Sequence, residues 1–375
     1  MKKIILFILT LAITLTLVSC SEEFEPVPST EEEAKTVLTL SFEGKSYDVA
    51  YELYRAFFLT YKDRVDGGDS SVWSGPEAAL YVEEINEMIL DSVADIYAAF
   101  HLCEKIGVDL DSKKYKDQIN AFINQSLDNI IALKKQEAKE NNIELELSRD
   151  EAYEIYLSRM KDDYLNYSVT ILLYKYQLAL LAIDEYYRGD FDPDDPSTYE
   201  EKGALEYTEN DVRSFYESAD SVKLIYFCKN VEYTTEQKIV ELRNKMANAT
   251  RSQMINMIIG ASSAGGPSEV ERGMVIGKYS LDNYYFGELT EIAFSMSYGD
   301  LSNVITLFDG NDDYYYVIYC DQKSSTHFET NYADVAYSYV SNEIGKIKES
   351  AKNGLENGCS YTYAYSSIVH SEIRM

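Results

Sequence analysis

The stretch "AFSMSYGDLSNVITLFDGNDDYYYVIYCDQK", residues 293–323, decides the fold of the C-terminal half of this 375-residue chain. Its first four residues end an apolar helical pattern, and Gly299 suits the left-handed conformation that follows a helix end. "NVITLF" and "YYYVIYC" are rich in β-branched and aromatic residues and flank the polar segment 309–313. A helix, a corner and a hairpin of two strands are therefore predicted in this order.

The segments upstream of this stretch extend the same domain. "SVKLIYFCKN", residues 221–230, predicts a strand, and two helices are expected in 235–249 and 252–261, the first capped by Thr234 with Gln237. The segment 262–273, "SSAGGPSEVERG", is expected to be a flexible loop. Strand, helices, helix, strand and strand together predict a small α+β domain with an antiparallel sheet.

The N-terminal half is predicted to be mostly helical. Apolar residues from Tyr81 to Cys103 recur at spacings of three and four, and Ser148 with Glu151 forms the signature of a helix-capping box. Before them, residues 36–61 indicate a strand, a turn at Gly44 and a helix that begins near Tyr47.

Acid-rich turns around Pro193 and Pro196 indicate a domain boundary. In the tail, an amphipathic helix is expected around residues 332–347, and "SSIVHSEI", residues 366–373, is expected to be a final strand. We therefore predict five segments: a signal peptide (1–19), an acidic linker (20–35), a helical chaperone-like domain (36–205), the small α+β domain (206–323) and a C-terminal helix and tail that pack on the helical domain (324–375).

The N-terminus, "MKKIILFILTLAITLTLVSC", has two lysines, an apolar run and then Cys20. This pattern indicates a secretory signal, because the apolar run is too short for an ordinary membrane-spanning helix. Its end resembles the lipobox of bacterial lipoproteins, which implies that Cys20 is acylated and becomes the new N-terminus. A plain signal peptide or a short anchor helix is the alternative. The lipobox implies an extracytoplasmic protein that is anchored to a bacterial membrane by lipid.

The formal net charge of −30 excludes whole classes of partner. Nucleic-acid binding needs clustered Lys and Arg, and no such cluster stands out. The acidic segment "SEEFEPVPSTEEE" after Cys20 is expected to be a solvated linker that holds the folded part away from acidic bilayers and wall polymers.

The cysteines and histidines show no catalytic or metal-binding pattern. Four cysteines besides Cys20 are widely spaced, so buried free thiols are favoured, although an exported protein could form disulfides. The three histidines are scattered and are expected to have no shared role. Asp309, Asn311 and Asp313 have the spacing that opens a calcium loop, but Tyr314 replaces the required glycine. We expect no metal and no cofactor.

Four stretches together resemble the parvulin-type peptidyl-prolyl isomerases, and the whole chain resembles the exported foldases that contain such a domain. Residues 207–227 resemble the entry helix and first strand of the family, and 254–266 resemble its short helix and serine-rich loop. Residues 272–279 are a loose version of its glycine-rich turn, and 293–323 are the best match. The helices on either side resemble the chaperone region of these foldases.

The resemblance implies an apolar cup that holds a proline ring while the preceding peptide bond rotates. The cup positions fall on Ile276, Tyr285, Leu289 and Phe294, with Met254 and Met257 behind them. For Met254, Met257 and Phe294, an ordinary place in the hydrophobic core is an equally good interpretation.

This chain departs from the family at the centre of the site. Two histidines that face each other beneath the pocket in the family correspond here to Tyr226 and Tyr316. An acid or a cysteine near the end of the serine-rich loop is missing between Gly260 and Ser268. Tyrosine can donate and accept a hydrogen bond but supplies no charge, so isomerase activity is expected to be weak or absent.

The alignment also predicts a register for the sheet. If Tyr226 lies opposite Tyr316, Cys228 faces Tyr314, and Cys320 lies six residues further on, about 20 Å away at the usual rise of a strand. A Cys228–Cys320 disulfide is therefore not expected.

Three functions remain open at this point. The first is a membrane-tethered foldase that binds unfolded or partly folded exported proteins, with a degenerate isomerase site. The second is a non-catalytic holdase or scaffold that keeps the parvulin fold, and the third is a surface lipoprotein that captures glycans. A homodimer is compatible with all three.

Overall fold

The computed structural model describes residues 29–66, 69–141, 143, 145–189, 203–263, 266–280, 283–308 and 313–373. These residues form two compact units, 29–182 with 348–373 and 183–347, each of which contains helices and one antiparallel sheet. The predicted α+β class is therefore confirmed. The predicted signal peptide and Cys20 lie outside the described residues.

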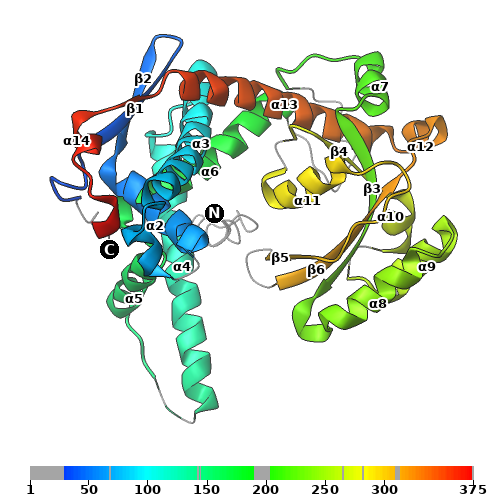
Figure 1. The fold of residues 1–375 in the computed structure, drawn as a ribbon, viewed down its shortest axis with the longest axis horizontal. Helices are drawn as coiled ribbons and strands as arrows, with labels where there is room; N and C mark the ends of the chain where they lie inside the picture. The colour runs from blue at the N-terminus through cyan, green and yellow to red at the C-terminus, as the bar shows by residue number, and fades with distance from the viewer. Residues whose placement is uncertain are drawn as a thin grey trace. The chain divides into compact units, whose positions relative to one another are not determined.

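The first unit consists of helices and a small sheet of order β2-β1-β7 (Figure 1). Its strands are β1 (Thr36–Phe42), β2 (Lys45–Ala50) and β7 (Ser360–Tyr361). Its helices are α2 (Tyr51–Asp66), η1 (Ser70–Ser74), α3 (Ala78–Lys105), α4 (Lys113–Glu140), α5 (Arg149–Asp162), α14 (Tyr363–Ser366), η4 (His370–Glu372) and parts of α6 (Tyr167–Arg188) and α13 (Tyr332–Asn357). The predicted capping box of Ser148 and Glu151 is present at the start of α5.

Two sequence predictions in this unit are wrong. The helix expected near Tyr47 begins at Tyr51, because Glu43 and Gly44 have φ values of 48° and 78° and close a two-residue hairpin, which pairs Lys45 with Phe42. Such a turn matches the twist of two antiparallel strands. The strand expected at 366–373 is replaced by the end of α14 and by η4, because the Thr362 hydroxyl accepts from the Tyr365 amide and starts a helical turn.

The C-terminal tail is held on the first unit by a polar network among aromatic rings. The Tyr54 hydroxyl donates to Asn86 Oδ1 at 2.7 Å and lies 3.0 Å from His370 Nε2. The Asn86 amide donates to the Tyr365 hydroxyl at 2.7 Å. Burial lowers the pKa of His370 below its ordinary value and so favours the neutral imidazole in the docked tail.

Docking of the tail should therefore weaken in mild acid. The folded-state pKa of His370 lies below its ordinary value of 6.5, so its contribution to stability is complete above about pH 6.5 and is lost as the pH falls through the lowered pKa. Hydrogen exchange of residues 363–373 should become several-fold faster, after correction for intrinsic rates, between about pH 7 and about pH 5. In His370→Gln the same window should show no such change. A wild-type profile as flat as that of the variant would contradict this role of His370.

The second unit is built on a four-stranded antiparallel sheet of order β4-β3-β6-β5. Its strands are β3 (Ser221–Asn230), β4 (Met274–Gly277), β5 (Ile305–Phe308) and β6 (Asp313–Asp321). Its shorter helices are α7 (Glu209–Glu217), η3 (Val231–Tyr233), α8 (Glu236–Met246), α9 (Arg251–Ala261), α10 (Pro267–Arg272), α11 (Asn283–Ser295) and α12 (Ser325–Thr330). The hairpin predicted from the opening stretch is the β5–β6 pair.

The segment expected to be a flexible loop contains the short helix α10, and the glycine-rich turn expected after it contains strand β4. Proline at the first position of α10 suits a helix start, and the Glu269 carboxylate accepts from the Gly266 amide at 2.6 Å. Gly273 then ends the helix at φ 73°. A side chain at Gly273 would clash with the Leu224 carbonyl, so the glycine also allows β4 to begin beside β3.

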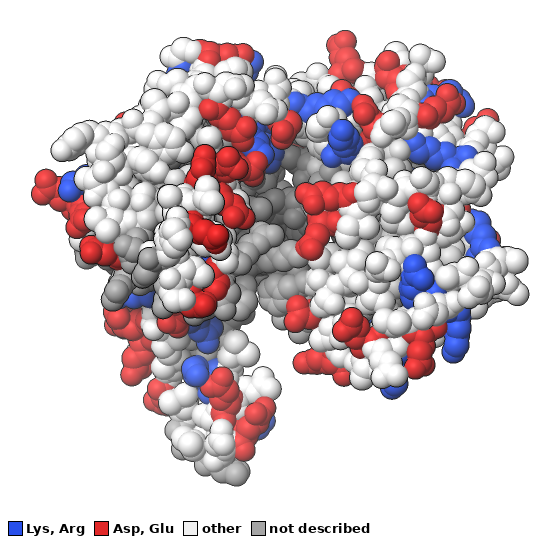
Figure 2. Space-filling view, in the orientation of Figure 1, with Lys and Arg blue, Asp and Glu red and all other residues white. Residues whose placement is uncertain are grey.

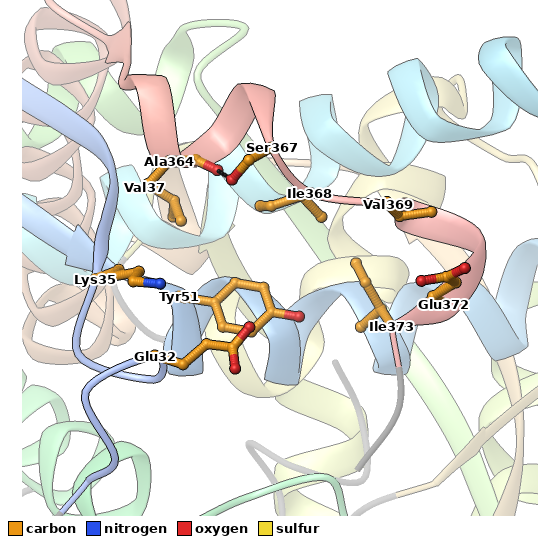
Figure 3. Close-up of a pocket in the computed structure, with 10 residues that line it drawn as sticks. All are labelled: Glu32, Lys35, Val37, Tyr51, Ala364, Ser367, Ile368, Val369, Glu372 and Ile373. Atoms are coloured by element: carbon orange, nitrogen blue, oxygen red, sulfur yellow. Dashed lines mark hydrogen bonds between the residues drawn. The ribbon is translucent and has the colours of Figure 1, made fainter.

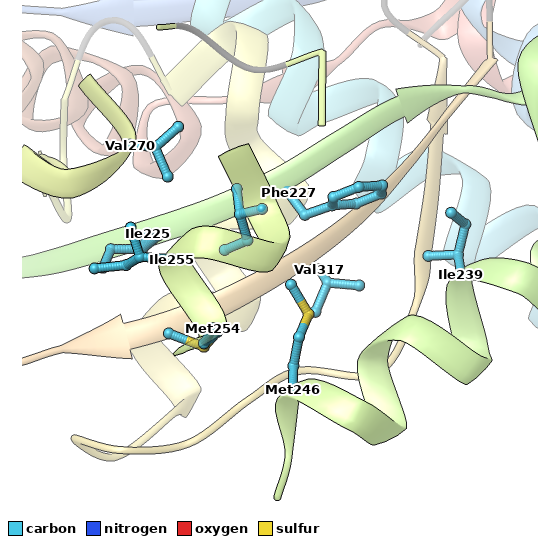
Figure 4. Close-up of a cluster of buried hydrophobic side chains, with 9 residues drawn as sticks. Ile225, Phe227, Ile239, Met246, Met254, Ile255, Val270 and Val317 are labelled. Carbon is cyan, nitrogen blue, oxygen red and sulfur yellow. The ribbon is translucent and has the colours of Figure 1, made fainter. Parts of the chain in front are cut away.

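Different side chains lie on the two faces of this sheet, because successive side chains of a strand point to opposite sides. Odd-numbered residues of β3 and β6 form a core with helices α8, α9 and α10, in which Phe227 is fully buried (Figure 4). Even-numbered residues of the same strands form a second cluster with α11. The predicted site residues must therefore be assigned to one face or the other.

The predicted register of β3 and β6 is wrong by two residues. Tyr226 lies opposite Ile318, Cys228 opposite Tyr316 and Leu224 opposite Cys320. Because the side-chain period of a strand is two, a shift of two residues leaves every side chain on its predicted face, and the hydrophobic pattern cannot distinguish the two registers. Cys320 lies four residues, about 13 Å, beyond the partner of Cys228, and the two cysteines form no disulfide with each other.

The observed register predicts which engineered disulfide forms. The amide and carbonyl of Cys320 bond to Asp300 and Gly299, away from β3, so Leu224 and Cys320 form a pair without mutual hydrogen bonds, with Cα atoms about 4.5 Å apart. Leu224→Cys should therefore crosslink to Cys320 under mild oxidation. The matched variant Val222→Cys should not, because diagonal neighbours lie about 7–8 Å apart, beyond disulfide reach. Peptide mapping by mass spectrometry reads the result, and the reverse outcome would restore the register predicted from sequence.

Candidate functional site

Three tyrosines gather on the α11 side of the sheet in the second unit. Tyr226 comes from β3, and Tyr314 and Tyr316 come from β6. The ring centroids of Tyr226 and Tyr316 are 6.4 Å apart, as are those of Tyr314 and Tyr316. Tyr316 is 9% exposed, whereas Tyr226 and Tyr314 are half-buried. We call the surface made by these three rings the tyrosine face.

Most of the predicted site residues meet at this face. Ile276 and Leu289 are buried in the same cluster as Tyr316, and Phe294 and Tyr226 pack against it partly exposed. Tyr226 and Tyr316, which the resemblance aligns with two histidines, do come together, as diagonal neighbours and not as directly opposed residues. Tyr285 belongs to α11, but its side chain is not among those described.

Met254 and Met257 lie on the other face of the sheet. Met254 is buried in the same core as Ile225 and Phe227 (Figure 4). Met257 packs against this core partly exposed. Their helix, α9, covers the odd-numbered side of β3. They are therefore ordinary core residues and do not line the tyrosine face.

The polar chemistry of the tyrosine face is that of neutral phenols. Burial, followed by the charges of Cys228 and Glu269, raises the pKa of Tyr226, so its hydroxyl remains protonated at neutral pH and can both donate and accept. Each histidine is engaged elsewhere: His101 with Tyr47, His327 with Tyr216 and His370 with Tyr54. Within the described part of the chain, no three or more His, Cys, Asp or Glu side chains are grouped so that they could hold a metal ion.

The serine-rich loop is attached to the edge of β3 beyond the end of β4. The Cys228 amide donates to Ser262 Oγ at 3.0 Å, and the Ser263 amide donates to the Cys228 carbonyl at 2.8 Å. These bonds place the start of the loop beside Cys228, which packs against the same cluster as Tyr226 and Tyr316.

Sequence reasoning missed Glu269, which follows this loop and whose charge acts on Tyr226. It lies one residue beyond the window in which an acid was sought. A glycine followed by proline, with glutamate three residues after the glycine, is a recognisable helix-start signal, and it would have placed this carboxylate beside the Gly266 amide.

The first unit contains a separate pocket of about 250 Å³ (Figure 3). Val37, Tyr51 and Ile368 supply its apolar walls, and Lys35 and Glu372 are among its charged residues. Burial raises the pKa of Tyr51, which keeps its hydroxyl neutral. The pocket therefore combines apolar walls with charges of both signs.

The surface is consistent with the strongly acidic composition. Figure 2 shows Asp and Glu side chains spread over the visible face, with Lys and Arg singly or in small groups among them. No helix of the described ranges is both long and apolar enough to cross a membrane.

Comparisons with known proteins give matches only at the level of structure. No family model and no curated protein matches the chain. Among solved structures, it is similar to foldase protein PrsA from Streptococcus pneumoniae, with 12% identity and a TM-score of 0.24 over 88% of this chain and 98% of that chain. It is also similar to PrsA from Bacillus subtilis, with 12% identity and a TM-score of 0.25 over 87% of this chain and 93% of that one. For foldase protein PrsA from Lactococcus lactis, identity is 11% and the TM-score 0.23, over 91% of this chain and 100% of the other.

Proposed function

We propose that this protein is an extracytoplasmic foldase, tethered to a membrane through Cys20, that binds unfolded segments of exported proteins on the tyrosine face. The observation that carries the proposal is the gathering of Tyr226, Tyr314 and Tyr316 on one apolar face of the sheet, where Tyr226 and Tyr314 are partly exposed. Tyrosine rings offer a large apolar area and a polar tip, and they lose little conformational entropy on binding. Such a surface suits extended segments of varied sequence.

Isomerisation at this face should be slow compared with binding. Rotation about an X-Pro bond crosses a barrier of about 18–20 kcal/mol, and catalysis must favour the twisted amide over the planar one. The tyrosine face can hold a proline ring and donate a hydrogen bond from a hydroxyl. Because Tyr226 stays neutral, it cannot supply the charge of a protonated histidine at that position.

A holdase without catalysis is the second candidate, and one observation favours it. Around the connection between α4 and α5, Leu133, Ile143 and Leu145 are exposed by 50%, 61% and 37%. Exposed apolar side chains of this kind can bind unfolded chains without any isomerase site.

The variant Tyr226→Ala separates these functions. In refolding of a small protein limited by X-Pro isomerisation, the wild type should accelerate the slow phase modestly, and Tyr226→Ala should abolish the acceleration because the ring contact is lost. Tyr226→Phe should keep most of it, since the ring remains. Tyr233→Ala, which removes a tyrosine that is 75% exposed in η3, is the matched control and should behave as wild type.

Aggregation of the same client, followed by light scattering, decides between the candidates. If the protein suppresses aggregation without changing the slow phase, and Tyr226→Ala suppresses it equally, the holdase is supported and the tyrosine face is not the binding site. If the wild type affects neither the refolding rate nor aggregation, the proposed foldase function is wrong.

The tether makes a separate prediction. In a bacterial host that processes lipoproteins, the wild-type chain should incorporate labelled palmitate and sediment with membranes, because two or more acyl chains anchor a protein stably. Cys20→Ala should lose the label and the membrane association. The control Cys359→Ala should keep both, since that cysteine lies in the folded part of the chain. Label retained in Cys20→Ala would rule out acylation at this position.

A further inference from the structure

Strand β5 is an outer strand of the sheet in the second unit, and only β6 lies beside it in that sheet (Figure 1). Ile305 of β5 lies opposite Tyr316 and Leu307 opposite Tyr314. Paired residues of antiparallel strands share a face, so these two side chains lie on the same side of the sheet as the tyrosine face, in the same cluster. The residue between them, Thr306, is exposed to solvent.

The hydrogen bonds of β6 show which way the backbone of β5 points. The Cys320 amide donates to the Asp300 carbonyl at 3.0 Å, away from β3. Because these directions alternate along a strand, the even-numbered residues of β6 point their amides and carbonyls toward β5. Their partners in β5 are the odd-numbered residues, which use their own groups in this ladder. The amide and carbonyl of Thr306 therefore point away from β6.

These outward groups of Thr306 are available to another chain. Among the described residues, none forms a hydrogen bond with them. The opposite edge of the sheet differs, because the Val275 carbonyl of β4 accepts from Ser338 Oγ of α13 at 2.7 Å. Strand β5, with the sequence Ile-Thr-Leu-Phe, also lacks the lysine, proline or charged residue that commonly protects an outer strand. A helix thus covers one edge of the sheet, and the β5 edge can accept a further strand.

We propose that unfolded client segments bind by adding an antiparallel fifth strand to β5. This inference rests on the proposed function, because it describes how the clients of the tyrosine face bind. A free amide and carbonyl at a strand edge pair with an extended backbone of any sequence, which suits clients of varied sequence. The antiparallel direction matches the pairings already present in this sheet and is the more stable one.

A second copy of this chain suits the β5 edge less well than a client does. Each copy has a formal net charge of −30, so two copies repel each other. An unfolded client segment has no such charge in general. We therefore assign the edge to the client.

Strand addition at this edge also places a client proline on the tyrosine face. The client residue opposite Thr306 directs its amide toward β5 and its side chain to the opposite face of the sheet. Its two neighbours direct their amides away from β5 and their side chains to the tyrosine face, beside Ile305 and Leu307. Proline has no amide hydrogen, so only these neighbouring positions accept it without the loss of a hydrogen bond.

Alternate N-methylation of a peptide tests the pairing with the full-length protein. In the fluorescein-labelled parent peptide, threonine and leucine alternate and one leucine is replaced by proline, so that the apolar side chains suit the tyrosine face. N-methylation of the threonine amides should weaken binding about fivefold or more, the value of one hydrogen bond, because these amides point toward β5. N-methylation of the leucine amides should leave the affinity unchanged. Fluorescence anisotropy measures each affinity.

The variant Thr306→Pro tests the same contact from the protein side. Proline removes the outward amide hydrogen, and an outer strand tolerates proline where the amide faces solvent. The parent peptide should bind this variant about fivefold more weakly. Ser46→Pro is the matched control at an exposed position of β2, an outer strand of the other sheet, and should bind as wild type. Its partner Ser41 donates its amide to Gly358, so this pair also lacks mutual hydrogen bonds.

The possible failures are distinguishable. If no peptide binds the wild type, the proposed function is wrong and the inference falls with it. If peptides bind, but N-methylated leucines weaken binding as much as N-methylated threonines or more, binding stands and strand addition to β5 is wrong. If the wild type is a dimer in analytical ultracentrifugation and Thr306→Pro is a monomer, a second copy occupies the edge and the proposal is wrong. The peptide series uses the wild type, so it decides even if Thr306→Pro does not fold.

Discussion

The pairing of β3 with β6 determines which side chains lie on each face of the four-stranded sheet in the second unit. In the observed pairing, odd positions of both strands face α8, α9 and α10, and Lys223 and Asp321 meet there in a buried ion pair. Even positions bring Tyr226 next to Tyr316. A slip of one residue would move the tyrosines among the helices and separate the buried lysine from its carboxylate, which is costly for a charge removed from water. The register that packs the hydrophobic core and pairs Lys223 with Asp321 thus also produces the tyrosine face.

Much of this unit could be predicted from residue pattern alone. The β5–β6 hairpin, strand β3 and helices α8 and α9 are all present where apolar spacing placed them. The register could not be predicted, because a shift of two residues preserves both faces. In the observed pairing Lys223 lies directly opposite Asp321, and the two form a buried ion pair at 2.9 Å. The turn at Gly44 was predicted, but strand β2 after it was missed, because only the tight two-residue hairpin at Glu43 and Gly44 returns residues 45–50 alongside β1.

Only part of the candidate site could be predicted from the sequence. Ile276, Leu289 and Phe294 meet Tyr226 and Tyr316 because short strands and one helix bring them together locally. Met254 and Met257 do not, because α9 packs against the odd-numbered face of the sheet. A sequence motif alone does not show which face of a sheet a helix covers. Glu269 was missed because its position depends on the short helix α10, which lies within a segment that composition alone indicates to be a loop.

The central claim is that unfolded segments bind at the tyrosine face, and contact mapping tests it most directly. A proline-containing client peptide with a diazirine next to the proline can be crosslinked by light to the full-length protein, and the modified residues can be identified by mass spectrometry. Crosslinks are expected in β3 and β6 at and beside Tyr226, Tyr314 and Tyr316, and in α11 near Leu289, and all should be lost in excess unlabelled peptide. Crosslinks confined to α8 and α9, or to the helices of the first unit, would contradict the claim.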